Sequence, residues 1–168
     1  MTEIQDPGAT PEALGIKTIG VIGAGQMGSG IAHVAATTGI NVILNDIGKE
    51  QLDKAVATID QNLERQVNRE KISPSDKQDA LERLNTSTDH EALGNCDIVI
   101  EAATEDEAIK REIYKTVIPS LRKDTIIASN TSSLSITRLG ATTDRPEKFM
   151  GMHFMNPVPI MQLVELIP

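Results

Sequence analysis

A short apolar run passes directly into a glycine-rich turn over residues 17–28: Lys17-Thr18-Ile19-Gly20-Val21-Ile22-Gly23-Ala24-Gly25-Gln26-Met27-Gly28. Short β-branched runs bounded by glycine are typical of buried strands. Residues 26–38 are compatible with a helix, and Gly39 stands where a helix C-terminal glycine belongs. The glycine pattern alone is a weak signal, but between a strand and a helix it predicts a dinucleotide-binding unit.

Each glycine of this pattern has a separate expected role. Gly23 allows the tight turn, Gly25 lets the backbone approach a pyrophosphate, and Gly28 lets the helix pack closely on the strand. Asp46 ends the next apolar run, where a carboxylate can accept a hydrogen bond from the ribose 2′-hydroxyl and repel a 2′-phosphate. We therefore expect NAD rather than NADP as the cofactor. The alternative is a glycine-rich turn with a solvated aspartate.

Apolar runs and amphipathic segments alternate along the rest of the chain. The predicted strands cover residues 17–22, 41–44, 97–103, 125–128, 148–154 and 161–167. The predicted helices cover residues 26–38, 49–69, a segment capped by Ser73, and a segment that opens with a Thr104–Glu107 capping box and buries Ile109, Ile113 and Val117. This alternation predicts an α/β fold of the Rossmann type: a doubly wound, mostly parallel sheet, a helical arm between early strands and a terminal antiparallel hairpin.

The composition argues against several classes of protein and of binding site. The 168 residues carry 16 Lys plus Arg and 24 Asp plus Glu, a net charge of −8, which disfavours nucleic acid and anionic membranes as partners. One cysteine and three histidines argue against a disulfide framework and against a structural metal site. Residues 1–15 look like a flexible leader without targeting features, so residues 16–168 form the predicted domain of a cytoplasmic protein.

Two polar features follow the predicted strands. The run Ser129–Ser133 comes after the strand at 125–128, and ligands of open α/β sheets sit beyond such strand ends. His153 and Glu165 face each other directly if their strands form an antiparallel hairpin centred on Pro159, and such a pair can serve as general base and orienting carboxylate. An ordinary helix-capping loop and a chance cross-strand pair remain the alternatives.

Five motifs in this order resemble the NAD-binding N-terminal domain of the L-3-hydroxyacyl-CoA dehydrogenase family, most closely its bacterial short-chain members. The resemblance runs from about Lys17 to Ile167. The motifs are GVIGAGQMG from Gly20, Asn45-Asp46, IEAATE from Ile100, SNTSSL from Ser129 and GMHFMNPVP from Gly151. The last two are far more specific than the glycine pattern.

The resemblance implies a role for several residues. His153 matches the catalytic base that takes the 3-hydroxyl proton, Glu165 its paired carboxylate, and Ser132 the serine that binds the substrate oxygen. The implied reaction is the reversible, NAD-dependent oxidation of (S)-3-hydroxybutyryl-CoA to acetoacetyl-CoA. The remaining implied contacts are Glu105, Lys110 and Asn130 for the cofactor, with Asn62 and Arg69 for the CoA phosphates.

The resemblance also implies what lies beyond this domain. Members of the family continue into a helical C-terminal domain that supplies the dimer interface and much of the acyl-CoA pocket. None of that domain lies within these 168 residues. We therefore expect a homo-oligomer in the full-length form, and we keep a second hypothesis: a stand-alone or truncated NAD-binding module without activity unless a partner domain joins it.

Overall fold

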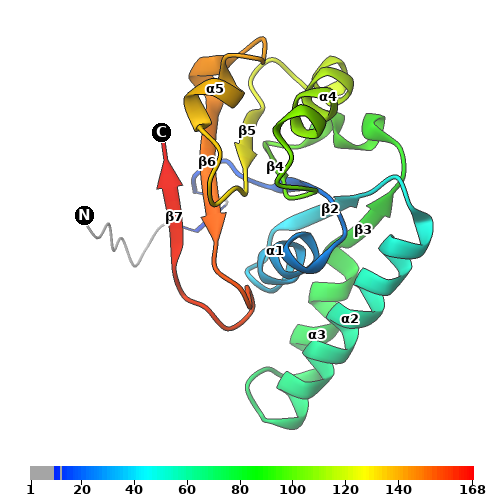
Figure 1. Ribbon diagram of the computed structural model, residues 1–168. Helices are drawn as coiled ribbons and strands as arrows, with labels where there is room; N and C mark the ends of the chain where they lie inside the picture. The colour runs from blue at the N-terminus through cyan, green and yellow to red at the C-terminus, as the bar shows by residue number, and fades with distance from the viewer. Residues whose placement is uncertain (1–9, 12) are drawn as a thin grey trace.

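A seven-stranded sheet forms the centre of the computed structural model, which describes residues 10–11 and 13–168; most of the predicted leader lies outside the described residues. The strand order is β3-β2-β1-β4-β5-β6-β7, and only β7 runs antiparallel to its neighbour. This order confirms the predicted doubly wound fold (Figure 1). The strands are β1 Thr18–Ile22, β2 Asn41–Asn45, β3 Leu84–Ser87, β4 Ile98–Glu101, β5 Ile126–Ser129, β6 Phe149–Phe154 and β7 Val164–Ile167.

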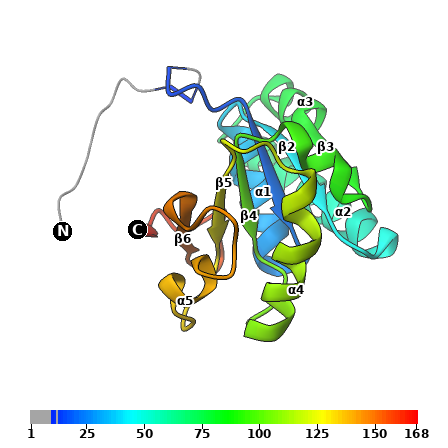
Figure 2. The same ribbon diagram turned by 90° about the horizontal axis from the view of Figure 1, so that it is seen from above.

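Helices cover both faces of the sheet, with α1, α2 and α3 on one side and α4 and α5 on the other (Figures 1 and 2). The helices are α1 Gln26–Thr37, α2 Lys49–Asn68, α3 Pro74–Arg83, α4 Glu107–Val117 and α5 Ile136–Gly140, with 3-10 turns η1 His90–Asn95, η2 Ile118–Ser120 and η3 Pro146–Lys148. Helices α2 and α3 form the predicted arm, which projects away from the sheet in Figure 1. Within the described residues, no helix is both long and apolar enough to cross a bilayer.

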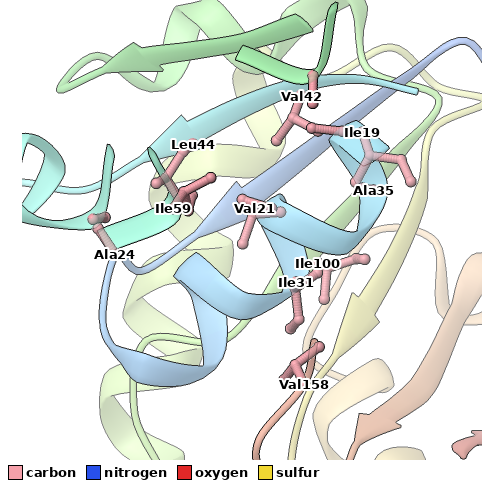
Figure 3. Packing of buried hydrophobic residues seen from close by; sticks show 14 of the residues in the cluster. Ile19, Val21, Ala24, Ile31, Ala35, Val42, Leu44, Ile59, Ile100 and Val158 are labelled. Carbon is pink, nitrogen blue, oxygen red and sulfur yellow. The ribbon is translucent and has the colours of Figure 1, made fainter. Parts of the chain in front are cut away.

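Alternation along the strands divides the core into two clusters. Val21 of β1 faces α1 and α2, whereas its neighbour Ile22 faces the side of α4. Figure 3 shows Ile31 of α1 close to Ile100 of β4 and to Val158, which follows β6. The core is mostly aliphatic, with Tyr114 and Phe149 in the cluster on the side of α4. Burial of such large apolar side chains contributes roughly 1.5–3 kcal/mol each.

One strand was missed by the sequence analysis. Strand β3 pairs in parallel with β2, from Val42 opposite Leu84 to Asn45 opposite Ser87. Its sequence, Leu-Asn-Thr-Ser, has a single apolar residue because it lies at the edge of the sheet and buries little. Its stability comes from backbone pairing, which leaves almost no signal in hydrophobic periodicity.

The predicted start of α4 was wrong. Its N-cap is Asp106, whose carboxylate accepts from the Ile109 N–H at 3.0 Å. Thr104 instead accepts from the Asp106 N–H at 3.1 Å, so the Thr104–Glu107 capping box does not form. With this later start, the buried face of α4 carries Lys110 rather than Ile109, which is 52% exposed.

The cap of α3 generates a stability prediction. Ser73 accepts from the Asp76 N–H at 3.0 Å and Asp76 accepts from the Ser73 N–H at 2.8 Å, which confirms the predicted cap. Ser73→Ala should lower the free energy of unfolding by about 1 kcal/mol because the Asp76 N–H loses its acceptor and the Asp76 carboxylate loses the Ser73 hydroxyl. Urea denaturation measures it, with the exposed Ser75→Ala as the matched control. Equal effects of the two substitutions would show that the cap contributes nothing.

Candidate functional site

The glycine turn has the geometry that a dinucleotide requires. Gly23 has φ +100°, and a Cβ at Gly28 would lie 1.7 Å from the Gly23 carbonyl oxygen, so both positions exclude larger residues. A Cβ at Gly25 would meet nothing within 4 Å, and Gly25 is the N-cap of α1 without a side-chain cap. The turn therefore leaves open space and unpaired N–H groups at a helix N-terminus, which suits a pyrophosphate.

Asp46 lies directly against this turn, at the end of β2. Its Oδ2 accepts from the Ala24 N–H at 2.8 Å, and its Oδ1 accepts from the Gly48 N–H at 2.9 Å. The carboxylate is thereby fixed beside the glycines, where a ribose hydroxyl would meet it and a phosphate would be repelled. The structure thus brings together the glycines and the aspartate that the sequence placed 18 residues apart.

An apolar cavity of about 580 Å³ adjoins Asp46, and the sequence analysis missed most of its lining. Ile47 is 91% exposed and Ile109 is 52% exposed, although both are large aliphatic residues. Both line this cavity, together with Ala103 and Ile113. Such a lining suits the flat, weakly polar adenine ring of a dinucleotide. The available signal was Ile47 itself, an apolar residue outside any strand and next to the predicted ribose contact.

Glu105 and Ser132 meet beyond the ends of β4 and β5. Glu105 accepts from the Thr131 hydroxyl at 2.7 Å, from the Ser132 N–H at 2.9 Å and from the Ser132 hydroxyl at 3.2 Å. Partial burial raises the pKa of Glu105, but the hydrogen bonds from Thr131 and Ser132 outweigh it and leave this pKa below its usual value. Glu105 is therefore an anion that fixes the serine loop.

Asn130 and Lys110 occupy structural positions. The Asn130 side-chain oxygen accepts from the Phe154 N–H at 2.9 Å, which ties the loop after β5 to β6. Lys110 is fully buried, and its ammonium pairs with the equally buried Glu101. The Lys110 ammonium therefore faces the protein interior, and its expected contact with the cofactor stays a prediction.

His153 and Glu165 form the pair expected from the hairpin register. They are directly opposite in the antiparallel ladder of β6 and β7, and His153 Nδ1 lies 2.8 Å from Glu165 Oε2. The imidazole remains reachable, because its side chain is 21% exposed and that of Glu165 is 48% exposed. A carboxylate on Nδ1 fixes the ring and directs the Nε2 lone pair away from the pair, as a general base requires.

A second cavity, of about 430 Å³, lies between α1, α2 and the residues after β6. Asn62 lines it, whereas Arg69 lies at the exposed end of α2, outside this lining. The two expected CoA contacts are therefore on one helix but not in one cavity. Asn156 and His33 also line the cavity. Asn156 belongs to the motif that starts at Gly151, but the sequence analysis gave it no role, and His33 stands in none of the five motifs.

Comparison with known proteins gives concordant matches. Residues 18–168 match the family domain described as 3-hydroxyacyl-CoA dehydrogenase, NAD binding domain. The 3-hydroxybutyryl-CoA dehydrogenase of Bradyrhizobium diazoefficiens is 53% identical over 152 residues, which cover 90% of this chain and 52% of the relative. The crystal structure of (S)-3-hydroxybutyryl-CoA dehydrogenase from Ralstonia eutropha is 49% identical, with a TM-score of 0.88 over 90% of this chain and 53% of that chain. This chain spans about half the length of the curated 3-hydroxybutyryl-CoA dehydrogenases that it matches.

Two glycine substitutions separate binding from folding. Gly25→Ala should leave the free energy of unfolding nearly unchanged, because its Cβ meets no protein atom, but should weaken NADH binding at least about tenfold by blocking the pyrophosphate. Gly28→Ala should destabilise the fold itself, because its Cβ would overlap the Gly23 carbonyl. Fluorescence titration and urea denaturation measure both properties. Undiminished NADH binding by Gly25→Ala would contradict the assigned pyrophosphate position.

Proposed function

This chain belongs to the 3-hydroxyacyl-CoA dehydrogenase family, as its NAD-binding domain, and we propose that the protein oxidises (S)-3-hydroxybutyryl-CoA reversibly to acetoacetyl-CoA. The observation that carries the proposal is the His153–Glu165 pair, with 2.8 Å between nitrogen and oxygen, on the sheet that also carries the glycine turn. The names of the relatives from Bradyrhizobium diazoefficiens and Ralstonia eutropha support the short-chain substrate.

The residues at the carboxyl edge of the sheet fit NAD. The open space at Gly25, the carboxylate of Asp46 and the apolar cavity beside Ile47 match its pyrophosphate, ribose and adenine in turn. NAD, when bound, supplies the acceptor for the hydride that leaves C3 of the substrate. Glu105 and Asn130 are the proposed contacts on the nicotinamide side, and Lys110 is retained there as a proposal from the family resemblance.

His153 is the proposed general base. With Glu165 accepting from Nδ1, the neutral imidazole presents its lone pair on Nε2, which takes the proton of the 3-hydroxyl group. In the reverse direction the same nitrogen returns the proton to the carbonyl oxygen. Glu165 stabilises the imidazolium that forms and holds the ring in one orientation, as paired carboxylates do in other acid–base sites.

Ser132 is the proposed partner of the substrate oxygen. It is exposed, and Glu105 holds both its N–H and its hydroxyl, so the loop is ordered before a substrate arrives. An ordered hydroxyl orients a ligand at a lower entropic cost than a mobile one.

Arg69 and Asn62 are the proposed contacts of the CoA phosphates on the arm helix. Because the net charge of the chain is −8, we do not propose nucleic acid or anionic membranes as partners. The proposed compartment is the cytoplasm.

The proposed base generates a kinetic prediction. In the enzyme that joins this domain to the further region present in the relatives, His153→Gln should lower kcat roughly 10²–10⁴-fold, since Gln cannot accept the proton. NADH affinity should stay unchanged because the glycine turn is untouched. Acetoacetyl-CoA reduction followed at 340 nm, alongside an NADH titration, measures both. Turnover near that of the unsubstituted enzyme would contradict the proposed mechanism.

A second candidate function is an NAD-binding module that has no activity without a partner domain. Its support is that apolar side chains are exposed along the edge strand β7. Saturable NADH binding without reduction of acetoacetyl-CoA by this chain would favour the module. Turnover by this chain would instead show that these 168 residues hold a sufficient active site.

The exposed strand also predicts association. Strand β7 lies at the edge of the sheet, and Leu166 on it is 61% exposed. Such an edge favours pairing with another chain, so the mass in sedimentation velocity should rise above that of a monomer as concentration increases. Leu166→Lys should restore the monomer, whereas Gln61→Lys on the exposed side of α2 should not. A monomer at every concentration would count against the prediction.

A further inference from the structure

The apolar cavity beside Asp46 has a charged residue in its wall that the proposed contacts do not use. Four residues of α4 line this cavity of about 580 Å³: Ile109, Glu112, Ile113 and Thr116. Residues three and four apart share one face of a helix, so these side chains form a single stripe along α4. The two isoleucines suit the apolar faces of adenine. The Glu112 carboxylate adds an anionic acceptor to the same stripe, and the apolar fit does not account for it.

The start of η1 forms another wall of the cavity, and buried hydrogen bonds hold it in place. His90 is the first residue of η1 and lines the cavity. Behind it, the side-chain nitrogen of the fully buried Asn45 donates to the Ser87 carbonyl at 2.9 Å and to the Asp89 carbonyl at 3.0 Å. Asp89 in turn caps η1 by accepting from the Glu91 N–H at 3.0 Å. A base that enters the cavity therefore meets walls on η1 and on α4 that are already formed.

Glu112 is the carboxylate of this cavity that has free hydrogen-bonding capacity. Both oxygens of Asp46 already accept from backbone N–H groups, and Asp46 is the proposed ribose contact. The hydroxyls of Thr104 and Thr116 are bonded to nearby backbone groups. The ion pair of Glu112 with Lys115 spans 3.8 Å, which is too long for a hydrogen bond, and the Glu112 side chain is 71% exposed. Its oxygens are thus available to a ligand.

The edge of adenine carries a group that matches this carboxylate. Adenine presents a 6-amino group, which donates hydrogen bonds, next to the acceptor nitrogen N7. An ionised carboxylate only accepts hydrogen bonds, so it pairs with an amino group and repels a carbonyl oxygen at the same position.

We propose that Glu112 is a specificity-determining residue for the base of the cofactor, and that its carboxylate accepts a hydrogen bond from the 6-amino group of adenine. This inference rests on the proposed placement of adenine in the cavity beside Ile47. It adds a reading of the base to a site whose other contacts fix the pyrophosphate and the ribose. A site that bonds a polar group of its ligand discriminates against an analogue that lacks the group.

Reduced nicotinamide hypoxanthine dinucleotide tests the bond, because it differs from NADH only in the base, where a 6-oxo group replaces the 6-amino group. In calorimetric titrations, this chain should bind NADH about three- to tenfold more tightly than the hypoxanthine analogue. Glu112→Gln should bring the two affinities within about twofold of each other, because the amide of Gln accepts from an amino group and donates to an oxo group.

A matched substitution separates this bond from a change in net charge. Glu147→Gln removes an exposed carboxylate on η3, outside the lining of the cavity, and should retain the preference for NADH. Because the Glu112 side chain is 71% exposed, Glu112→Gln should fold as the unsubstituted chain does, and urea denaturation checks this.

Three results would overturn the inference and leave the NAD site standing. The first is equal affinity of the unsubstituted chain for the two dinucleotides. The second is a preference for NADH that Glu112→Gln retains, which would mean that another group sets it. The third is an equal loss of preference in Glu147→Gln, which would mean that net charge alone matters. Absence of saturable NADH binding would instead contradict the cofactor site itself, and this inference with it.

Discussion

A single buried carboxylate, Glu101, connects the strand ends on which the site is built. Its Oε2 accepts from the Lys110 ammonium, from the Ser129 hydroxyl at 3.0 Å and from the Tyr114 hydroxyl at 3.2 Å, while its Oε1 accepts from the Ala103 N–H at 2.8 Å. Burial, with the Glu101 charge beside it, raises the pKa of Tyr114, so that hydroxyl remains a donor. A buried ion pair is a poor source of stability, because desolvation offsets the attraction of its charges. Its contribution is geometric, because it holds the last residues of β4 and β5 against the first turns of α4. The loops that carry Glu105 and Asn130 start from these fixed strand ends.

The proposed cofactor-binding part and the proposed substrate-binding part of the site are joined by hydrogen bonds between residues that are far apart in sequence. The Asn130 N–H donates to the Glu101 carbonyl at 2.8 Å, and its side-chain oxygen holds the Phe154 N–H, next to His153. The His153–Glu165 pair on β6 and β7 is thus fixed relative to the loop after β5 before any ligand binds. Such preorganisation is the main contribution of a rigid sheet to acid–base catalysis.

Much of this arrangement could be predicted from sequence, since it depends on local pattern. The glycine turn, Asp46 and the register that opposes His153 to Glu165 follow from spacing along strands. Strand β3 could not be found because an edge strand needs little apolar content. Ile109 was misplaced because its aliphatic side chain lines a surface cavity instead of the core. Lys110 illustrates the remaining limit: only the fold shows that its ammonium meets Glu101 in the interior.

The most direct test of the account is a calorimetric titration of this chain with NADH and with NADPH. The turn at Gly25, the carboxylate of Asp46 and the apolar cavity beside Ile47 predict one saturable site for NADH. They also predict binding of NADPH at least about tenfold weaker, because its 2′-phosphate would face the Asp46 carboxylate. Equal affinity for the two nucleotides, or no saturable binding of NADH, would contradict the central claim that this sheet edge is an NAD site.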